Sequence, residues 1–249
     1  MPVQIREQLD FAYILYRKGL YNQALKLLDK TKTTALHYEE KSLAYEILEL
    51  EKIIESQYIT RSIRNRAELL IQQTEELSAL TQLNAKLSNL SLQLYGIFLK
   101  MGYARTEEEA ATIKSYFYDN IPEYNFKELG FHEKLWLYKA HLWFSFITQD
   151  FLACYRYSMK WIDLFNEYPH LVSLHPVSYI KGNHYLLESL FYLNHVKLFE
   201  KMLKKMEATL KDPKIPDDDN IKALSFLYLY SNKLNLRFMK GEFAKGRNF

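Results

Sequence analysis

Residues 11–28 read FAYILYRKGLYNQALKLL, and this stretch decides the fold. Apolar side chains, among them Ala24 and Leu28, recur in its second half at the spacing of one helix face. Gly19 separates this helix from an earlier one and suits a chain reversal, because glycine reaches positive φ without a Cβ penalty. Ala12 and Ala24 are small, so the two helix axes can approach closely. The stretch therefore predicts an antiparallel helical hairpin.

The same small-residue position recurs along the chain. Counting from Ala24, intervals of 43 to 47 residues lead to Ala67, Ala110, Cys154, Phe199 and Gly246. Apolar periodicity, Gly and Pro positions and helix-start signals then predict a series of paired helices. We expect the pairs Gln4–Lys18 with Tyr21–Lys32, His37–Ser56 with Arg61–Ala79, Gln82–Lys100 with Glu107–Asn120, His132–Thr148 with Asp150–Glu167, and Pro176–Leu193 with Val196–Lys211, and a last pair that opens at about Asp219 and turns at Gly241.

The Gly-x-aromatic-x-x-Ala arrangement of Gly19, Tyr21 and Ala24 resembles the tetratricopeptide (TPR) helix–turn–helix. With the later positions included, nearly the whole chain resembles the TPR-like repeat regions of long bacterial proteins of uncharacterised function. A period near 44 exceeds the 34 residues of an ordinary TPR, which indicates longer helices or links. The resemblance implies an all-α, TPR-like solenoid of about six hairpins, forming one domain over residues 1–249.

The last residues, MKGEFAKGRNF, repeat the Gly-x-aromatic turn and then stop. We therefore expect an incomplete last hairpin and a chain that is part of a longer protein, since a solenoid ends in a polar capping helix. This expectation predicts a poorly covered apolar face on the helix before the turn, at Leu227, Leu234 and Phe238. The Leu and Ile pattern of residues 37–79 also fits a coiled-coil arm, although packing between neighbouring hairpins is the favoured interpretation.

Composition excludes several classes of protein. A net charge of +3, from 33 basic and 30 acidic residues, argues against a dedicated polyanion binder, so nucleic acid is an unlikely partner. Seven Gly and six Pro are too few for a β-sandwich. A single cysteine excludes a disulfide framework and a multi-thiolate metal site. Neither a signal peptide nor an apolar run of membrane-spanning length occurs, so we expect a cytoplasmic protein without membrane contact.

Motifs of enzymes and cofactor sites are missing from the sequence. It contains no GxxxxGK[ST], GxGxxG or GxSxG pattern, which argues against a phosphate-binding loop or a serine hydrolase. His170 and His175 flank a link but lack the paired spacing of a zinc site. Cys154 occupies a small-residue position and reads as a buried structural thiol. We expect no cofactor, no metal and no catalytic residues.

A TPR-like stack presents a concave surface lined by the first helix of each hairpin. The first-repeat pattern directs Arg6, Tyr13, Tyr16 and Arg17 toward this groove, and the same offsets in the fifth repeat give Lys181, His184, Glu188 and Tyr192. These last four share one helix face, opposite to core positions such as Leu186 and Leu190. We expect the stripe to be exposed.

A mixed aromatic and charged lining suits an extended peptide or protein segment better than a metabolite. The sequence therefore predicts a non-enzymatic protein-interaction scaffold with a protein or peptide partner. One alternative is a peptide-sensing regulator that controls an effector domain outside this chain. A less favoured alternative is an RNA-binding helical repeat that uses the basic cluster Arg61, Arg64 and Arg66.

Overall fold

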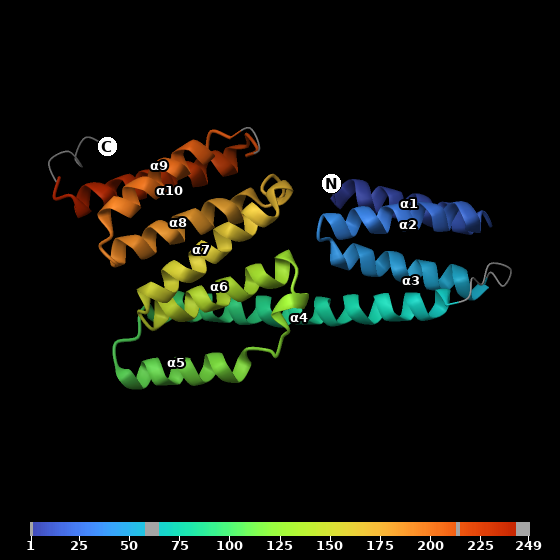
Figure 1. Ribbon diagram of the computed structural model, residues 1–249, viewed down its shortest axis with the longest axis horizontal. Helices are drawn as coiled ribbons and strands as arrows, with labels where there is room; N and C mark the ends of the chain where they lie inside the picture. Colours follow the sequence, from blue (N-terminus) through green and yellow to red (C-terminus); the bar gives the residue numbers. More distant parts are fainter. Residues whose placement is uncertain (1, 58–64, 213–214, 243–249) are drawn as a thin grey trace. The chain divides into compact units, whose positions relative to one another are not determined.

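The computed structural model describes residues 2–57, 65–212 and 215–242, and within these ranges every regular element is helical (Figure 1). The prediction of an all-α protein is confirmed for this part of the chain. The chain divides into two compact units, described separately below. Unit 1 comprises residues 1–86 and 124–133, and unit 2 comprises residues 87–123 and 134–249.

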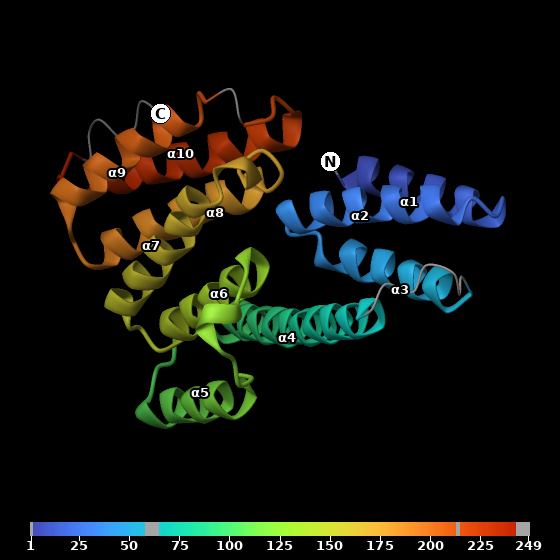
Figure 2. The same cartoon turned by 45° about the vertical axis from the view of Figure 1, so that its right-hand side comes forward.

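Unit 1 begins with three helices that pack in chain order. They are α1 (Pro2–Arg17), α2 (Tyr21–His37) and α3 (Lys41–Gln57), and each packs on the next, while α1 also contacts α3 (Figure 2). Ala12 and Ala24 are fully buried in their core, which confirms the close approach expected of the first hairpin. Ile47 of α3 and Leu70 of the next helix join the same core. Of residues 37–79, the described helices thus contribute side chains to one core within this unit, and not to the contacts between neighbouring hairpins that the sequence predicted.

The next helix corrects the predicted pairing. Helix α4 runs without interruption over Arg66–Met101, 36 residues, where the sequence predicted two helices, Arg61–Ala79 and Gln82–Lys100. The predicted start at Arg61 lies outside the described residues. The predicted break at residues 80–81 is wrong because Leu80-Thr81 contains neither Gly nor Pro, so nothing in the backbone stops the helix there. The second and third hairpins therefore do not exist as predicted.

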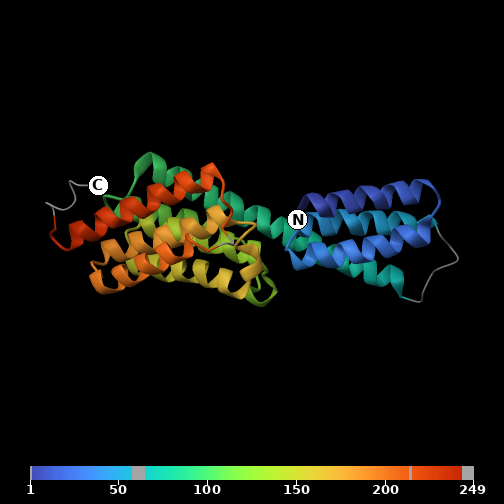
Figure 3. The same ribbon diagram turned by 90° about the horizontal axis from the view of Figure 1, so that it is seen from above.

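Unit 2 contains the helices whose bounds were predicted within a few residues. In chain order the elements after α4 are α5 (Glu107–Asn120), η2 (Phe126–Glu128, in unit 1), α6 (Phe131–Ile147), α7 (Phe151–Glu167), η3 (Pro169–Leu171), α8 (Pro176–Tyr192), α9 (Val196–Thr209) and α10 (Asp219–Met239). From α7 to α10 each helix packs on the next, and α8 also contacts α10 (Figure 3). Helix α6 meets α4 and α5 through aromatic side chains, among them Trp143 with Tyr95 and Phe144 with Phe117.

The same tight turn follows five of the helices. The second residue after each of these helices adopts positive φ, and the N–H of the residue that follows it donates to the carbonyl five residues earlier, as in a Schellman motif. His195 N, for example, lies 3.0 Å from Leu190 O. The positive-φ residues are Gly19, Glu39, Gln149, Asn194 and Gly241. Glycine therefore marks only two of the five turns, and sequence reasoning could not recognise the turn at Glu39 by its residue type.

A buried position follows four of these turns by five residues. Ala24, Ala44, Cys154 and Phe199 occupy it, and all four are fully buried. The predicted register is thus correct at Ala24, Cys154 and Phe199. It is wrong at Ala67, which is exposed near the start of α4, and Ala110 is only half-buried. The predicted position Gly246 lies outside the described residues.

The outer face of α10 is apolar and poorly covered. Leu227, Leu234 and Phe238 are 56%, 43% and 61% exposed, which confirms the expectation for this helix. None of the described helices has the length and apolar content needed to cross a bilayer.

Candidate functional site

The four predicted groove residues of α1 belong to unit 1. Tyr13 and Tyr16 are half-buried against its core, and the Tyr16 hydroxyl donates to Gln57 Oε1 at 2.9 Å. Arg6 and Arg17 are exposed. The tyrosines of α1 thus contribute to packing within the unit, and only the two arginines extend into solvent.

The four predicted residues of α8 belong to unit 2, so the structure does not bring the two sets together within one unit. Lys181, His184 and Glu188 are half-buried, contrary to the expected exposure, whereas Tyr192 is exposed as predicted. The side chains of His184 and Glu188 are 17% and 28% exposed, less than a solvated helix stripe would be. Residues of α10 and of the link after α4 bury these side chains. The helix-face pattern of α8 alone could not predict this, because it contains no information about those segments. Leu186 and Leu190, on the opposite face, are core residues as predicted.

His184 is held in one orientation by α10. Its ring stacks on Tyr228, with centroids 4.1 Å apart and an interplanar angle of 10°. Its Nδ1 lies 3.1 Å from Asn232 Nδ2, which can only donate. Burial, with Lys181 as a further cause, lowers the pKa of His184 to about 4. The ring is therefore neutral at pH 7 and carries its proton on Nε2, which lies 3.7 Å from Glu188 Oε2.

Three tyrosines lie within electrostatic range of Glu188. Its charge acts on Tyr103, Tyr185 and Tyr228, whose pKa values are all raised, chiefly by burial. Burial also raises the pKa of Glu188 itself, to about 7. Among the described residues, His184 is the one basic side chain within ion-pair distance of this carboxyl group, and it is neutral at pH 7.

Tyr192 connects α8 to the link after α4. Its hydroxyl lies 2.6 Å from the hydroxyl of Tyr103, and its ring stacks on Phe151 at 4.3 Å. Tyr103 follows Gly102, whose φ of +70° lets the chain turn at the end of α4. We call the set formed by Tyr103, His184, Tyr185, Glu188, Tyr192 and Tyr228 the Glu188 cluster.

Three members of the Glu188 cluster were missed by the sequence pattern. Tyr103, Tyr185 and Tyr228 come from the α4–α5 link, α8 and α10, and no fixed spacing connects them. The one signal in the sequence was its high tyrosine content, 20 residues in 249, which does not indicate which of them meet.

A group of one lysine and two tryptophans from α6 and α7 lies beside α8 near Lys181 and Gly182. Lys139 Nζ sits 4.3 Å from the ring centroid of Trp136 and 4.8 Å from that of Trp161. Burial and the charge of Lys181 lower the pKa of Lys139 to about 8, while the two indole faces favour its charged form. Gly182 lets the Trp161 indole approach the α8 backbone, since an added Cβ would lie 3.1 Å from its Nε1.

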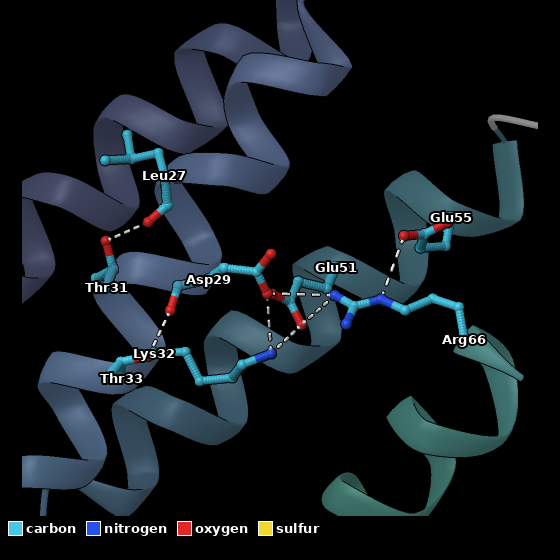
Figure 4. A network of polar contacts seen from close by, with 8 residues as sticks. All are labelled: Leu27, Asp29, Thr31, Lys32, Thr33, Glu51, Glu55 and Arg66. Carbon is cyan, nitrogen blue, oxygen red and sulfur yellow. Dashed lines mark hydrogen bonds and ion pairs between the residues drawn. The ribbon is translucent and has the colours of Figure 1, made fainter. Parts of the chain in front are cut away.

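A network of polar side chains in unit 1 joins helices α2, α3 and α4 (Figure 4). Glu51 is fully buried and accepts a hydrogen bond from Lys32 Nζ at 2.7 Å. Arg66 lies within 3.5 Å of carboxylate oxygens of Asp29, Glu51 and Glu55, so it ties the start of α4 to α2 and α3. Arg66 is thus engaged by three carboxylates, whereas Arg61 and Arg64 of the predicted basic cluster lie outside the described residues.

The described residues that remain as candidates for a nucleophile or a metal ligand are not arranged as a reactive site. Cys154 is fully buried, and burial raises the pKa of its thiol far above its usual range, so it stays protonated. Over the described residues, no three His, Cys, Asp or Glu side chains are grouped to hold a metal ion. His170 lies within η3 and His175 is the N-cap residue of α8, and both are half-buried.

Comparison with known proteins found no matching family model, no similar curated protein and no similar solved structure.

Proposed function

We propose that this protein is a non-enzymatic interaction module that binds a peptide or protein segment at the Glu188 cluster and the adjacent Lys181. The observation that carries the proposal is the chemistry of this α8 face. It combines aromatic rings, which make large contacts at little entropic cost, with Lys181 and Glu188, neither of which pairs with an oppositely charged group among the described residues. Such a mixture is typical of binding surfaces and unusual for a helix face that only meets solvent.

A TPR-like architecture is part of the proposal. Its support is the recurrence of one turn geometry, the buried position five residues later, and the packing of each helix on its neighbour from α7 to α10. In a TPR-like stack the first helix of a hairpin lines the binding surface, and α8 is the first helix of the α8–α9 hairpin. RNA binding is less favoured, because three carboxylates already occupy Arg66.

Selection from a displayed library of random peptides tests this function. We expect the full chain to enrich a family of related peptides. The double variant Lys181→Gln with Glu188→Gln removes both charges and keeps both side chains polar, and it should weaken binding of those peptides about tenfold or more, as expected for the loss of contacts worth about 1 kcal/mol each. Its helical circular dichroism should be unchanged.

The matched control also replaces one lysine and one glutamate. Lys205→Gln on α9 with Glu108→Gln on α5 changes two exposed side chains, and peptide binding should be unaffected. If the enriched peptides bind the α8 variant as tightly as the wild type, or if no related peptides are enriched, the proposal is wrong.

A further inference from the structure

Glu188 is a carboxylate that no charged cation among the described residues pairs with. It lies in the middle of α8, and the titratable groups on other elements that its charge reaches are Tyr103 on the α4–α5 link, Cys154 on α7 and Tyr228 on α10. All three keep their protons at pH 7, because burial raises their pKa values. On α8 itself, His184 is neutral at pH 7. Lys181 is seven residues away, about 10 Å along the helix, too far for a contact ion pair.

The carboxyl group is nevertheless accessible. Its side chain keeps 28% of its surface exposed. His184 Nε2, on a ring held by Tyr228 and Asn232, lies 3.7 Å from Glu188 Oε2, beyond hydrogen-bond distance. Neither carboxylate oxygen has a hydrogen bond to a described residue. A half-buried acceptor with free capacity is suited to a ligand that brings donors and positive charge.

The surrounding rings narrow the chemistry of that ligand. Tyrosine faces attract cations through their quadrupole, and a planar guanidinium can stack on a ring while its N–H groups bind a carboxylate. A guanidinium is also more weakly hydrated than an ammonium, so moving it into a half-buried site costs less. These properties favour arginine over lysine.

We propose that the Glu188 cluster is a recognition site for an arginine side chain of the bound peptide, whose guanidinium pairs with the Glu188 carboxylate and contacts the tyrosine rings. This inference rests on the proposed function and specifies the chemistry of the partner.

The site should also respond to pH. Only the ionised carboxyl group pairs with a cation, and its pKa of about 7 means that binding must displace a proton in neutral or mildly acidic solution. Over this range His184 stays neutral and the tyrosines and Cys154 stay protonated, so Glu188 is the group of the cluster that changes. Affinity for a guanidinium should therefore rise about tenfold from pH 6 to pH 8.

The experiment compares N-acetyl-arginine N-methylamide with its citrulline analogue, which has nearly the same shape and no charge. Binding to the full chain is followed by NMR through the indole N–H signal of Trp143, whose ring lies 5.1 Å from that of Tyr185. At pH 8 we expect the arginine probe to bind at least about tenfold more tightly than the citrulline probe. Glu188→Gln should abolish this difference, whereas Glu108→Gln should preserve it.

Several results would overturn the inference. Equal affinity for the two probes, an arginine preference that survives Glu188→Gln, or no binding of either probe in the millimolar range would each contradict it. If library peptides still depend on Lys181 and Glu188 in such a case, the binding surface stands and only the partner's chemistry is wrong. If those peptides are also insensitive to both residues, the proposed function fails as well.

Discussion

At the scale of single residues, the small side chain five positions after a tight turn decides how closely two helices can pack. Ala24 and Ala44 both hold this place and are fully buried. Ala67 was assigned to the same role by its distance from Ala24, yet it is exposed. The difference arises because Ala44 follows the positive-φ turn at Glu39, whereas Ala67 lies in the first turn of α4.

Replacing Ala44 by leucine should therefore destabilise unit 1. Added methyl groups have no space in a closely packed core, so we expect Ala44→Leu to lower the free energy of unfolding by roughly 1–3 kcal/mol. The same change at Ala67 should stay within about 0.5 kcal/mol, as for most surface substitutions. A urea titration followed by far-UV circular dichroism measures both. A neutral Ala44→Leu would show that the turn-based register is wrong.

At the scale of elements, the main question is why α4 is one helix. Local signals predicted the starts of α5 and α7 closely because side chains cap them. Thr106 accepts a hydrogen bond from Glu109 N at 3.1 Å, and Asp150 accepts one from Ala153 N at 2.9 Å. Residues 79–82 carry no capping bond of this kind, and both halves of α4 are anchored by packing, through Leu70 in unit 1 and through Tyr95 against Trp143 in unit 2.

Proline at position 82 distinguishes one helix from two. In a continuous α4, Gln82→Pro removes an internal hydrogen bond and clashes with the preceding turn, so it should cost about 3 kcal/mol or more. If a separate helix began at Gln82, proline would occupy its first position and be tolerated. Glu107→Pro is the control, since Glu107 is the first residue of α5 after the cap Thr106. Thermal unfolding that is equally unaffected by both prolines would contradict the single helix.

At the scale of the whole molecule, each unit contributes its own core to stability. Unit 1 is built around α1 to α3 with Leu70 and Leu77, and unit 2 has a cluster that includes Leu187, Phe199 and Ile221. All three tryptophans, Trp136, Trp143 and Trp161, lie in unit 2. Their fluorescence therefore reports on the unit that contains Glu188.

The buried Glu188 should make unit 2 less stable at high pH. Its folded pKa, about 7, lies above the ordinary value of 4.5, so the folded state binds the proton more tightly than the unfolded state does. Stability is therefore highest below the ordinary pKa and falls as the pH rises to about 7, by at most about 3 kcal/mol. Thermal unfolding followed by tryptophan fluorescence at pH 5 and pH 8 measures the change.

A neutral isostere provides the comparison. Glu188→Gln should remove much of this pH dependence and raise the melting temperature at pH 8, while Glu108→Gln should behave as the wild type. A pH dependence that is unchanged in Glu188→Gln would show that the carboxyl group is not destabilised by burial.

The helical class, the α1–α2 hairpin and the bounds of α6 to α10 could be predicted from the sequence alone. These features depend on local physics: helix periodicity, caps such as Asp150, and the positive φ of Gly19 that only a few residue types adopt easily. The stripe on α8 was likewise readable, because residues on one helix face follow from spacing alone.

Two of the turns and the Glu188 cluster depend on tertiary packing and could not be predicted from local sequence. The turns at Glu39 and Gln149 place at positive φ two residue types that rarely adopt it. The packing of the helices on both sides of each turn outweighs the conformational energy that positive φ costs there. The Glu188 cluster likewise required Tyr103 and Tyr228 to arrive from a distant link and another helix. Sequence spacing placed Glu188 on its helix, but only burial in the folded structure raises its pKa, and no charged cation of the described residues pairs with it.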